Sequence, residues 1–319
     1  MTAEFADRDE VLRRYALVGG PEDMVPRLER VAKACASSPE LTQWAQEQAE
    51  ALFEAVPAVN IEKQRVPERE LGEDVGAFNM MVALASVPQI AETHRRFGLP
   101  PGHLAHTFSW FRPMIEIYRR RHAGVSGITH TRTFWFRKHA DGELFRFGSM
   151  EFLRGPVPSY VPEDFRATLG PGDEVPTFHY PGGPNGLDPV AIKAAFAEAN
   201  AFWLRAFGRY PRAWACDSWL FNPAWRELIP NSRIAHAIDL FDELPPLAYN
   251  PDEPSGLFFV YGRERCDPRD FPATNSLERA FVTLYERAQK PTDGCAWVKV
   301  DREGRTLFAP RQASAGLQR

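Results

Sequence analysis

Three short segments of the sequence carry side chains that can move protons or hold a charged substrate. They are Leu144–Leu153 with Arg146 and Glu151, Val175–Tyr180 with His179 and Tyr180, and Ala213–Trp219 with Asp217 and Ser218. Each segment has the apolar or alternating pattern of a strand, and a glycine-rich turn follows the second one. Because reacting groups collect at strand ends in α/β folds, these polar residues are the first candidates for a site.

The residue types suit acyl transfer to an amine. That reaction needs a base for the attacking nitrogen, donors for the thioester oxygen and an acid near the leaving thiolate. His179 is the predicted base, Asp217 either orients it or binds a substrate ammonium, and Tyr180 or Tyr261 protonates the thiolate. The alternative for His179 is a hydrogen-bonded structural role, and Cys216 is predicted to be a buried packing residue.

Other common enzyme classes lack their signatures in this sequence. No Walker loop, GxGxxG, HExxH or GxSxG motif and no paired-cysteine metal motif is present. Ser218 lacks the glycine-flanked elbow of a serine hydrolase, so that activity ranks last. The four cysteines lie far apart, which favours a reducing compartment and predicts no metal site.

Composition limits the partners. The chain has 319 residues, 44% of them hydrophobic, which is enough to form the cores of two unequal parts. Its formal charge of -4 gives no general attraction to nucleic acid. No stretch approaches 18 uncharged apolar residues, so we expect no membrane association and a cytoplasmic protein. A homodimer is left open.

The first part is predicted to be a helical domain over residues 1–125. Apolar residues recur at the helical period from Pro21 to Phe97, with Ser38 as a cap before Pro39. Gly102–Arg121 is predicted to form one long helix.

The second part, residues 126–319, is predicted to be α/β. The first segment, Leu144–Leu153, contains two short strand-like runs, Leu144–Gly148 and Met150–Leu153. Besides these and the two strands that follow, the pattern predicts helices at Pro189–Phe207, Ile234–Phe241 and Leu277–Ala288, a strand at Leu257–Tyr261, and a closing hairpin from Cys295–Val300 and Arg305–Ala309. Asp188 and Asn275 are the predicted caps of the first and last of these helices.

Five motifs occur in an order that resembles a known family. They are FRFGSMEF (Phe145–Phe152), FHYPGG (Phe178–Gly183), WACDSWLFNPAWRELIPNSRI (Trp214–Ile234), FFVYG (Phe258–Gly262) and FPATNSLERAF (Phe271–Phe281). The set resembles a bacterial acyltransferase family with a helical N-acyltransferase N-terminal domain and a GNAT-like C-terminal domain. The resemblance covers most of the chain and is strongest from Gly142 to Arg287.

This resemblance implies transfer from acyl-CoA to an amine of a small molecule, on a bent mixed sheet flanked by helices. The strand Ala213–Trp219 would open a cleft for the pantetheine arm, with Trp219 beside the cofactor and Ser218 beside the thioester. The pyrophosphate would lie at helix starts after that strand, with Asn222 or Ser232 as caps and Arg226 or Arg233 for charge. Arg146 and Glu151 would contact the substrate.

The sequence departs from the family pattern in three ways. The (Q/R)xxGx(G/A) pyrophosphate loop is absent, Asp217 replaces an expected histidine, and Glu151 replaces an expected glutamine. Two alternatives therefore stay open beside acyl-CoA transfer. One is a donor that is an aminoacyl-tRNA or a carrier-protein thioester, with Arg119–His122 and Arg263–Arg265 as a basic face. The other is a non-catalytic module that binds a metabolite.

Overall fold

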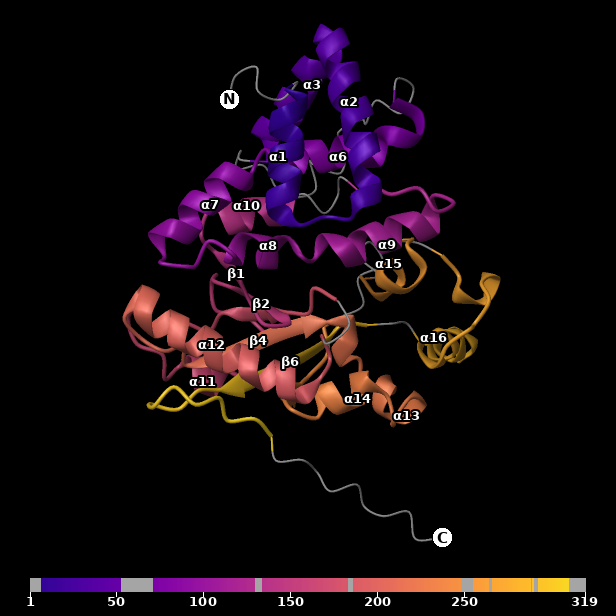
Figure 1. Cartoon of the computed structure of the whole chain (residues 1–319). Coiled ribbons are helices and arrows are strands. Elements are labelled where there is room, and N and C mark those ends of the chain that lie inside the picture. Colours follow the sequence, from indigo (N-terminus) through magenta and orange to yellow (C-terminus); the bar gives the residue numbers. More distant parts are fainter. Residues whose placement is uncertain are drawn as a thin grey trace. The chain divides into compact units, whose positions relative to one another are not determined.

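The computed structural model describes residues 7–52, 71–129, 134–182, 186–247, 255–263, 266–287, 289 and 292–309. The chain divides into two compact units, residues 1–145 and residues 146–319. Figure 1 follows the chain from the helical first unit to the sheet of the second.

The described elements that lie wholly within unit 1 are helices. These are α1 (Arg8–Val18), η2 (Glu22–Met24), α2 (Val25–Ser37), α3 (Pro39–Ala51), η3 (Gly72–Asp74), α6 (Val75–Leu84), α7 (Val87–Arg96), α8 (His103–Phe108), α9 (Phe111–Arg121) and α10 (Phe134–Ala140). The predicted cap before α3 is confirmed, because Ser38 Oγ accepts a hydrogen bond from Leu41 N at 3.2 Å.

The single helix predicted for Gly102–Arg121 is wrong. The structure has two helices there, α8 and α9, separated at Ser109 and Trp110. Both the N–H and the hydroxyl of Ser109 donate to the His106 carbonyl, so the turn tightens instead of continuing. The apolar pattern persists across the break because both helices bury the same side.

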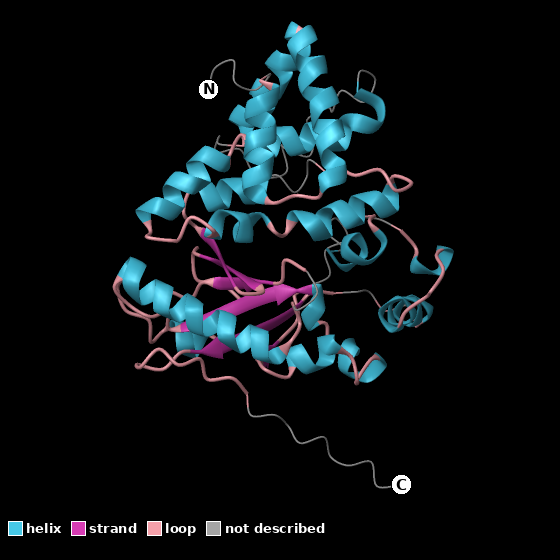
Figure 2. Ribbon diagram, viewed as in Figure 1, coloured by secondary structure: helices cyan, strands magenta, loops and turns pink. Residues whose placement is uncertain are grey.

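Unit 2 contains most of a six-stranded mixed sheet with the order β1-β2-β3-β4-β6-β5 (Figure 2). The strands are β1 (Leu144–Phe147), β2 (Met150–Leu153), β3 (Thr177–His179), β4 (Ala213–Ser218), β5 (Asp242–Leu244) and β6 (Gly294–Lys299). The helices are α11 (Glu163–Arg166), α12 (Pro189–Phe207), η5 (Trp219–Phe221), α13 (Ala224–Leu228), α14 (Arg233–Ile238), α15 (Ser255–Tyr261), η6 (Pro268–Asp270) and α16 (Ser276–Glu286). The predicted fold class, a helical region followed by a GNAT-like mixed sheet with helices, is confirmed.

One pair of neighbouring strands in this sheet is parallel. β3 pairs with β4 in parallel, with Thr177 opposite Ala215, whereas β2 with β3, β4 with β6 and β5 with β6 pair antiparallel. The 19-residue helix α12 makes the crossover between β3 and β4, as parallel strands require. Its predicted boundaries are confirmed: Asp188 caps its start, and Gly208 ends it in the left-handed conformation.

The two faces of the sheet differ in what covers them. On one face, Phe152 and Phe178 pack edge-on against Phe196 of α12, each with ring centres 5.1 Å apart. On the other face, Ala215 and Trp297 pack with the segment between β2 and β3, which contributes Val161 and Val175. Side chains that alternate along each strand therefore enter two separate layers.

Two predicted elements of unit 2 are wrong, and one strand was not predicted. Leu257–Tyr261 lies in the helix α15 and not in a strand. A short run made up almost entirely of apolar residues shows neither the helical nor the strand period, so its sequence does not distinguish a helix from a strand. The edge strand β5 was not predicted because its residues Asp242 and Glu243 are charged and exposed. Arg305–Ala309 forms an isolated bridge at Thr306 instead of a strand.

Gly294 is expected to be essential for the pairing of β4 with β6. A methyl group there would lie 1.8 Å from the backbone oxygen of Phe221, and Gly294 pairs with Ser218 in the ladder. Gly294→Ala should therefore destabilise unit 2 by about 2 kcal/mol, as overpacking does. Urea unfolding followed by tryptophan fluorescence measures this. Gly155→Ala, which meets no atom within 4 Å, is the control; equal losses would contradict the expectation.

Candidate active site

Four ionisable side chains form a row across one face of the sheet. They are Arg146 on β1, Glu151 on β2, His179 on β3 and Asp217 on β4. Glu151 lies directly opposite His179 in the antiparallel β2–β3 ladder. Thr177 pairs with Ala215 in the parallel β3–β4 ladder. His179 and Asp217 each lie two residues further along, so they are side by side on the two strands. We call these four residues the polar row.

Strand alternation explains why the polar row shares one face. Its members sit next to Phe147, Phe152 and Phe178, whose rings contact α12 or one another on the opposite face. Thr177 lies on the same side as His179, with its Oγ1 at 3.1 Å from the His179 Nε2. The row crosses the carboxyl ends of the parallel strands, where α/β folds place their ligands.

His179 is held in its neutral form. Burial lowers its pKa from the ordinary value of 6.5, and this outweighs the negative charges of Glu151 and Asp217, which act to raise it. A neutral imidazole at physiological pH has a lone pair that can accept a proton. His179 is therefore chemically suited to act as a base.

Arg146 and Glu151 form a buried ion pair. Arg146 Nη1 lies 3.6 Å from Glu151 Oε1, and the two residues are only 6% and 7% exposed. Burial lowers the pKa of Arg146, whereas the carboxylate of Glu151 opposes that shift. The pair places the negative charge of Glu151 next to His179 with a compensating cation behind it.

Asp217 has a partner that the sequence did not reveal. Tyr160, in the segment after β2, donates its hydroxyl hydrogen to Asp217 Oδ1 at 2.9 Å. Burial and the charge of Asp217 raise the pKa of Tyr160 well above its ordinary value, so the hydroxyl remains a donor. Tyr160 is 57 residues away from Asp217 in the sequence. Its position in a proline-rich segment was the one feature of the sequence that set it apart.

Tyr180 and Ser218 lie apart from the polar row. The Tyr180 ring is 6.1 Å from the rings of both Phe178 and Phe221, on the opposite face from His179. Its hydroxyl is buried without a hydrogen bond among the described residues, and burial raises its pKa well above 10. Ser218 Oγ accepts from Leu220 N and so caps η5.

Four residues predicted to hold a cofactor have structural partners of their own. Trp219 packs against Trp225 and Phe281, 9% exposed. Asn222 accepts from Ala224 N and donates to the carbonyl of Thr292.

The other two are Arg226 and Ser232. Arg226 forms ion pairs with Asp239 and Glu243, and Ser232 caps α14 through the Ala235 N–H. The predicted caps are thus present, although nothing in these contacts assigns a ligand to them.

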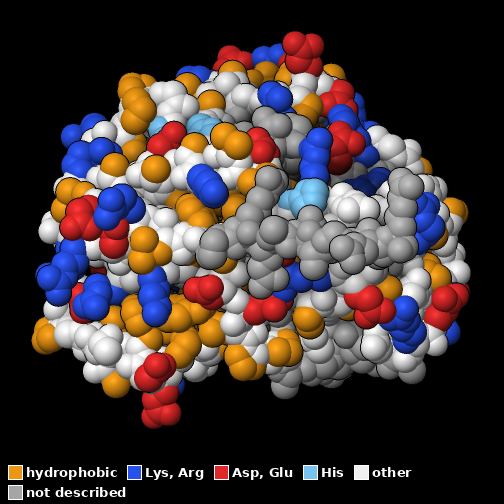
Figure 3. Space-filling model, turned by 90° about the horizontal axis from the view of Figure 1, so that it is seen from below, with side chains coloured by type: hydrophobic (Ala, Val, Ile, Leu, Met, Phe, Trp, Pro, Cys, Tyr) orange, Lys and Arg blue, Asp and Glu red, His pale blue; other side chains and the backbone are white. Residues whose placement is uncertain are grey.

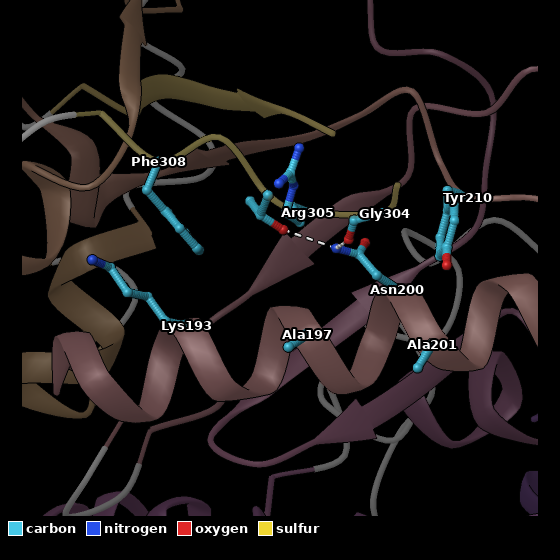
Figure 4. Close-up of a pocket in the computed structure, with 9 residues that line it drawn as sticks. Lys193, Ala197, Asn200, Ala201, Tyr210, Gly304, Arg305 and Phe308 are labelled. Carbon is cyan, nitrogen blue, oxygen red and sulfur yellow. Dashed lines mark hydrogen bonds between the residues drawn. The ribbon is translucent and has the colours of Figure 1, made fainter. Parts of the chain in front are cut away.

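Arg233 is the predicted cofactor residue that lines a hollow. Together with His236 of α14 it borders a space of about 220 Å³ at the start of α12, next to Leu187, Asp188 and Pro189. A second hollow, of about 310 Å³, lies between α12 and residues 304–308 (Figure 4). There Asn200 Nδ2 donates to the Gly304 carbonyl, and its Oδ1 accepts from Trp214 Nε1. None of the polar-row residues lines either hollow.

Metal ligation and thiol chemistry have no observed support in the part of the chain that the structure describes. Within it, no group of three or more His, Cys, Asp or Glu side chains is arranged to hold a metal. Cys216 is 1% exposed, and burial raises its pKa well above 9, so its predicted role as a packing residue is confirmed.

None of the described helices is long and apolar enough to cross a membrane. Basic and acidic side chains lie interspersed on the face in Figure 3.

The two parts of the chain match two domain families. Residues 6–142 match the N-acyltransferase N-terminal domain, and residues 144–298 match the GNAT-like C-terminal domain. The chain belongs to the acyltransferase family that joins these domains. The family resemblance noted in the sequence is thereby confirmed, and so is the prediction of an enzyme.

Solved structures with the fold of this acyltransferase carry acyl-CoA ligands. An acyltransferase in complex with decanoyl-CoA and teicoplanin has a TM-score of 0.69 and 21% identity, covering 91% of this chain and 88% of that one. A mutant acyltransferase in complex with octanoyl-CoA has a TM-score of 0.69 and 20% identity, with coverage of 92% and 88%. At these identities the likeness establishes the fold. No curated protein sequence matches the acyltransferase.

Removing Arg146 should expose the cost of an uncompensated buried carboxylate. Arg146→Met is expected to lower the free energy of unfolding by about 3 kcal/mol, because Glu151 stays charged and buried without its cation. The double variant Arg146→Met with Glu151→Gln should recover part of this loss. Urea titration of the unmodified protein, the single variants Arg146→Met and Glu151→Gln, and the double variant measures the coupling. A double variant as unstable as the sum of the two single variants would show that the two residues do not interact.

Proposed function

We propose that this acyltransferase moves an acyl group from acyl-CoA to an amine of a small molecule, with His179 as the general base. The observation that carries the proposal is the neutral His179 between the carboxylates of Glu151 and Asp217 at the carboxyl end of the parallel strand pair. This arrangement supplies a proton acceptor and negative charge on both sides to stabilise the imidazolium that forms.

In the proposed reaction the amine nitrogen attacks the thioester carbonyl while His179 takes a proton from that nitrogen. The new C–N bond gives a tetrahedral intermediate, which collapses with cleavage of the C–S bond. The electron pair of that bond leaves on sulfur, and the proton removed from nitrogen, or one from water, neutralises the thiolate. Glu151, backed by Arg146, lowers the energy of the charged imidazole during these steps.

Acyl-CoA is the proposed donor because the solved relatives hold octanoyl-CoA, decanoyl-CoA or CoA in the same fold. Arg233 borders the hollow at the start of α12, the next helix after β3, and Asp188, which caps that helix, borders it too. A phosphate group would interact favourably with the guanidinium of Arg233. We therefore retain Arg233 as the proposed pyrophosphate residue.

An aminoacyl-tRNA or carrier-protein donor has less support. Arg119 of the predicted basic face is engaged in ion pairs with Asp23 and Glu116 within unit 1. The segment 263–265 lies partly outside the described residues. A small-molecule acceptor is also in keeping with the relative that holds teicoplanin.

The pH dependence of the reaction should report the ionisation of His179. Because the pKa of His179 lies below 6.5, its basic form is present above that pKa, and kcat/KM should fall only as the pH drops below about 6.5. Release of CoA from octanoyl-CoA, with water or butylamine as the nucleophile, measures the rate. His179→Ala should lose about 10²-fold or more and should lack this inflection.

His122→Ala is the matched control, since it removes an imidazole from unit 1, where His122 stacks on Tyr118. It should keep both the rate and the pH profile. Retention of the inflection in His179→Ala would refute the assignment of the base. Failure of the intact protein to bind or consume octanoyl-CoA would refute the donor.

A further inference from the structure

The two carboxylates that flank His179 have different partners. Glu151 is buried, and the guanidinium of Arg146 compensates its charge at 3.6 Å. Asp217 is half-buried, and within the described residues no cation lies within ion-pair distance of it. The negative charge that is left over in the polar row therefore resides on Asp217.

Tyr160 orients Asp217 without neutralising it. Its hydroxyl donates to Oδ1 at 2.9 Å, and a neutral donor leaves the carboxylate charge in place. Tyr160 is itself fixed, because it packs against the cluster formed by Val161, Val175, Ala213, Ala215 and Trp297. With Oδ1 occupied, Oδ2 has the capacity for a further donor.

The charges around this position favour a cation. The polar row itself contributes four groups: the carboxylates of Glu151 and Asp217, the neutral imidazole of His179, and the guanidinium of Arg146 one strand beyond Glu151. Their sum is one negative charge, and it lies beside the base. A half-buried carboxylate with an ordered neutral donor is a well-suited partner for an ammonium group, because its charge is only partly screened by water.

Building on the proposed function, we infer that the acceptor binds as an ammonium ion, with Asp217 as its ligand and Tyr160 as the residue that positions Asp217. The acceptor class is then an aliphatic amine that is protonated near neutral pH, in preference to an alcohol or a weakly basic amine. The ammonium first releases one proton to water through His179, which returns to its neutral form. The neutral amine then forms the C–N bond while His179 takes a second proton from the nitrogen, the C–S bond breaks, and that second proton passes to the thiolate.

The test uses two probes of equal shape and different charge, butylammonium and 1-butanol. The full-length protein is titrated with each, and the imidazole resonances of His179 are followed by NMR at neutral pH. Butylammonium should shift these resonances in a saturable way, whereas 1-butanol should not. Because no acyl donor is present, the outcome does not depend on whether acyl-CoA is the donor.

Two variants assign the site. Asp217→Asn should abolish saturable binding of butylammonium, and Tyr160→Phe should weaken it about tenfold, since a hydrogen bond to a charged group is lost. Tyr160→Phe also keeps the inference testable if Asp217→Asn does not fold. Matched controls remove the same groups elsewhere in unit 2: Asp173→Asn, whose carboxylate pairs with Arg212, and Tyr210→Phe, beside Gly304. Both should bind butylammonium as the unmodified protein does.

The inference is overturned if the unmodified protein gives no saturable shift with butylammonium, or if 1-butanol gives the same shift. It is also overturned if Asp217→Asn, shown to be folded by circular dichroism, binds butylammonium unchanged. In either case, the acyl-CoA assay of the preceding section can still succeed, so the two proposals fail separately.

Discussion

The parallel pairing of β3 with β4 is the constraint on which the second unit depends. Parallel neighbours cannot be joined by a tight turn, so the chain must leave the sheet, cross one face and return, and α12 makes that crossing. The aromatic side chains of the strands then bury themselves against α12. The alternate side chains are directed to the other face, where the polar row lies.

Within the polar row, burial and charge act on His179 in opposite directions. Two carboxylates would normally favour the protonated imidazole, but desolvation is the larger effect and the imidazole stays neutral. This balance is possible because Glu151 is compensated by Arg146 and Asp217 is held by Tyr160. The base is neutral before the reaction, yet carboxylates are in place to stabilise the proton that it receives.

The sequence predicted the elements whose signals are local. α12 has an aspartate cap, a proline at its first position and a glycine at its end, and α16 has a complete capping box between Asn275 and Glu278. Polar residues at strand ends likewise identified His179 and Asp217 as candidates. Tyr160 was missed because its contact with Asp217 arises only when the β2–β3 connection folds over the sheet, and α15 was misassigned because its short apolar run is compatible with either element.

The period of two along a strand has a consequence for which length changes the fold tolerates. One inserted or deleted residue within β3 would turn His179 toward α12 and bring Phe178 into the polar layer, so a single-codon indel there would exchange a base for a phenyl ring. The connection between β2 and β3 can gain or lose single residues without this effect, provided that the Tyr160 hydroxyl still reaches Asp217. Descendants of this chain can therefore differ in loop length, whereas the short strands must keep their residue count.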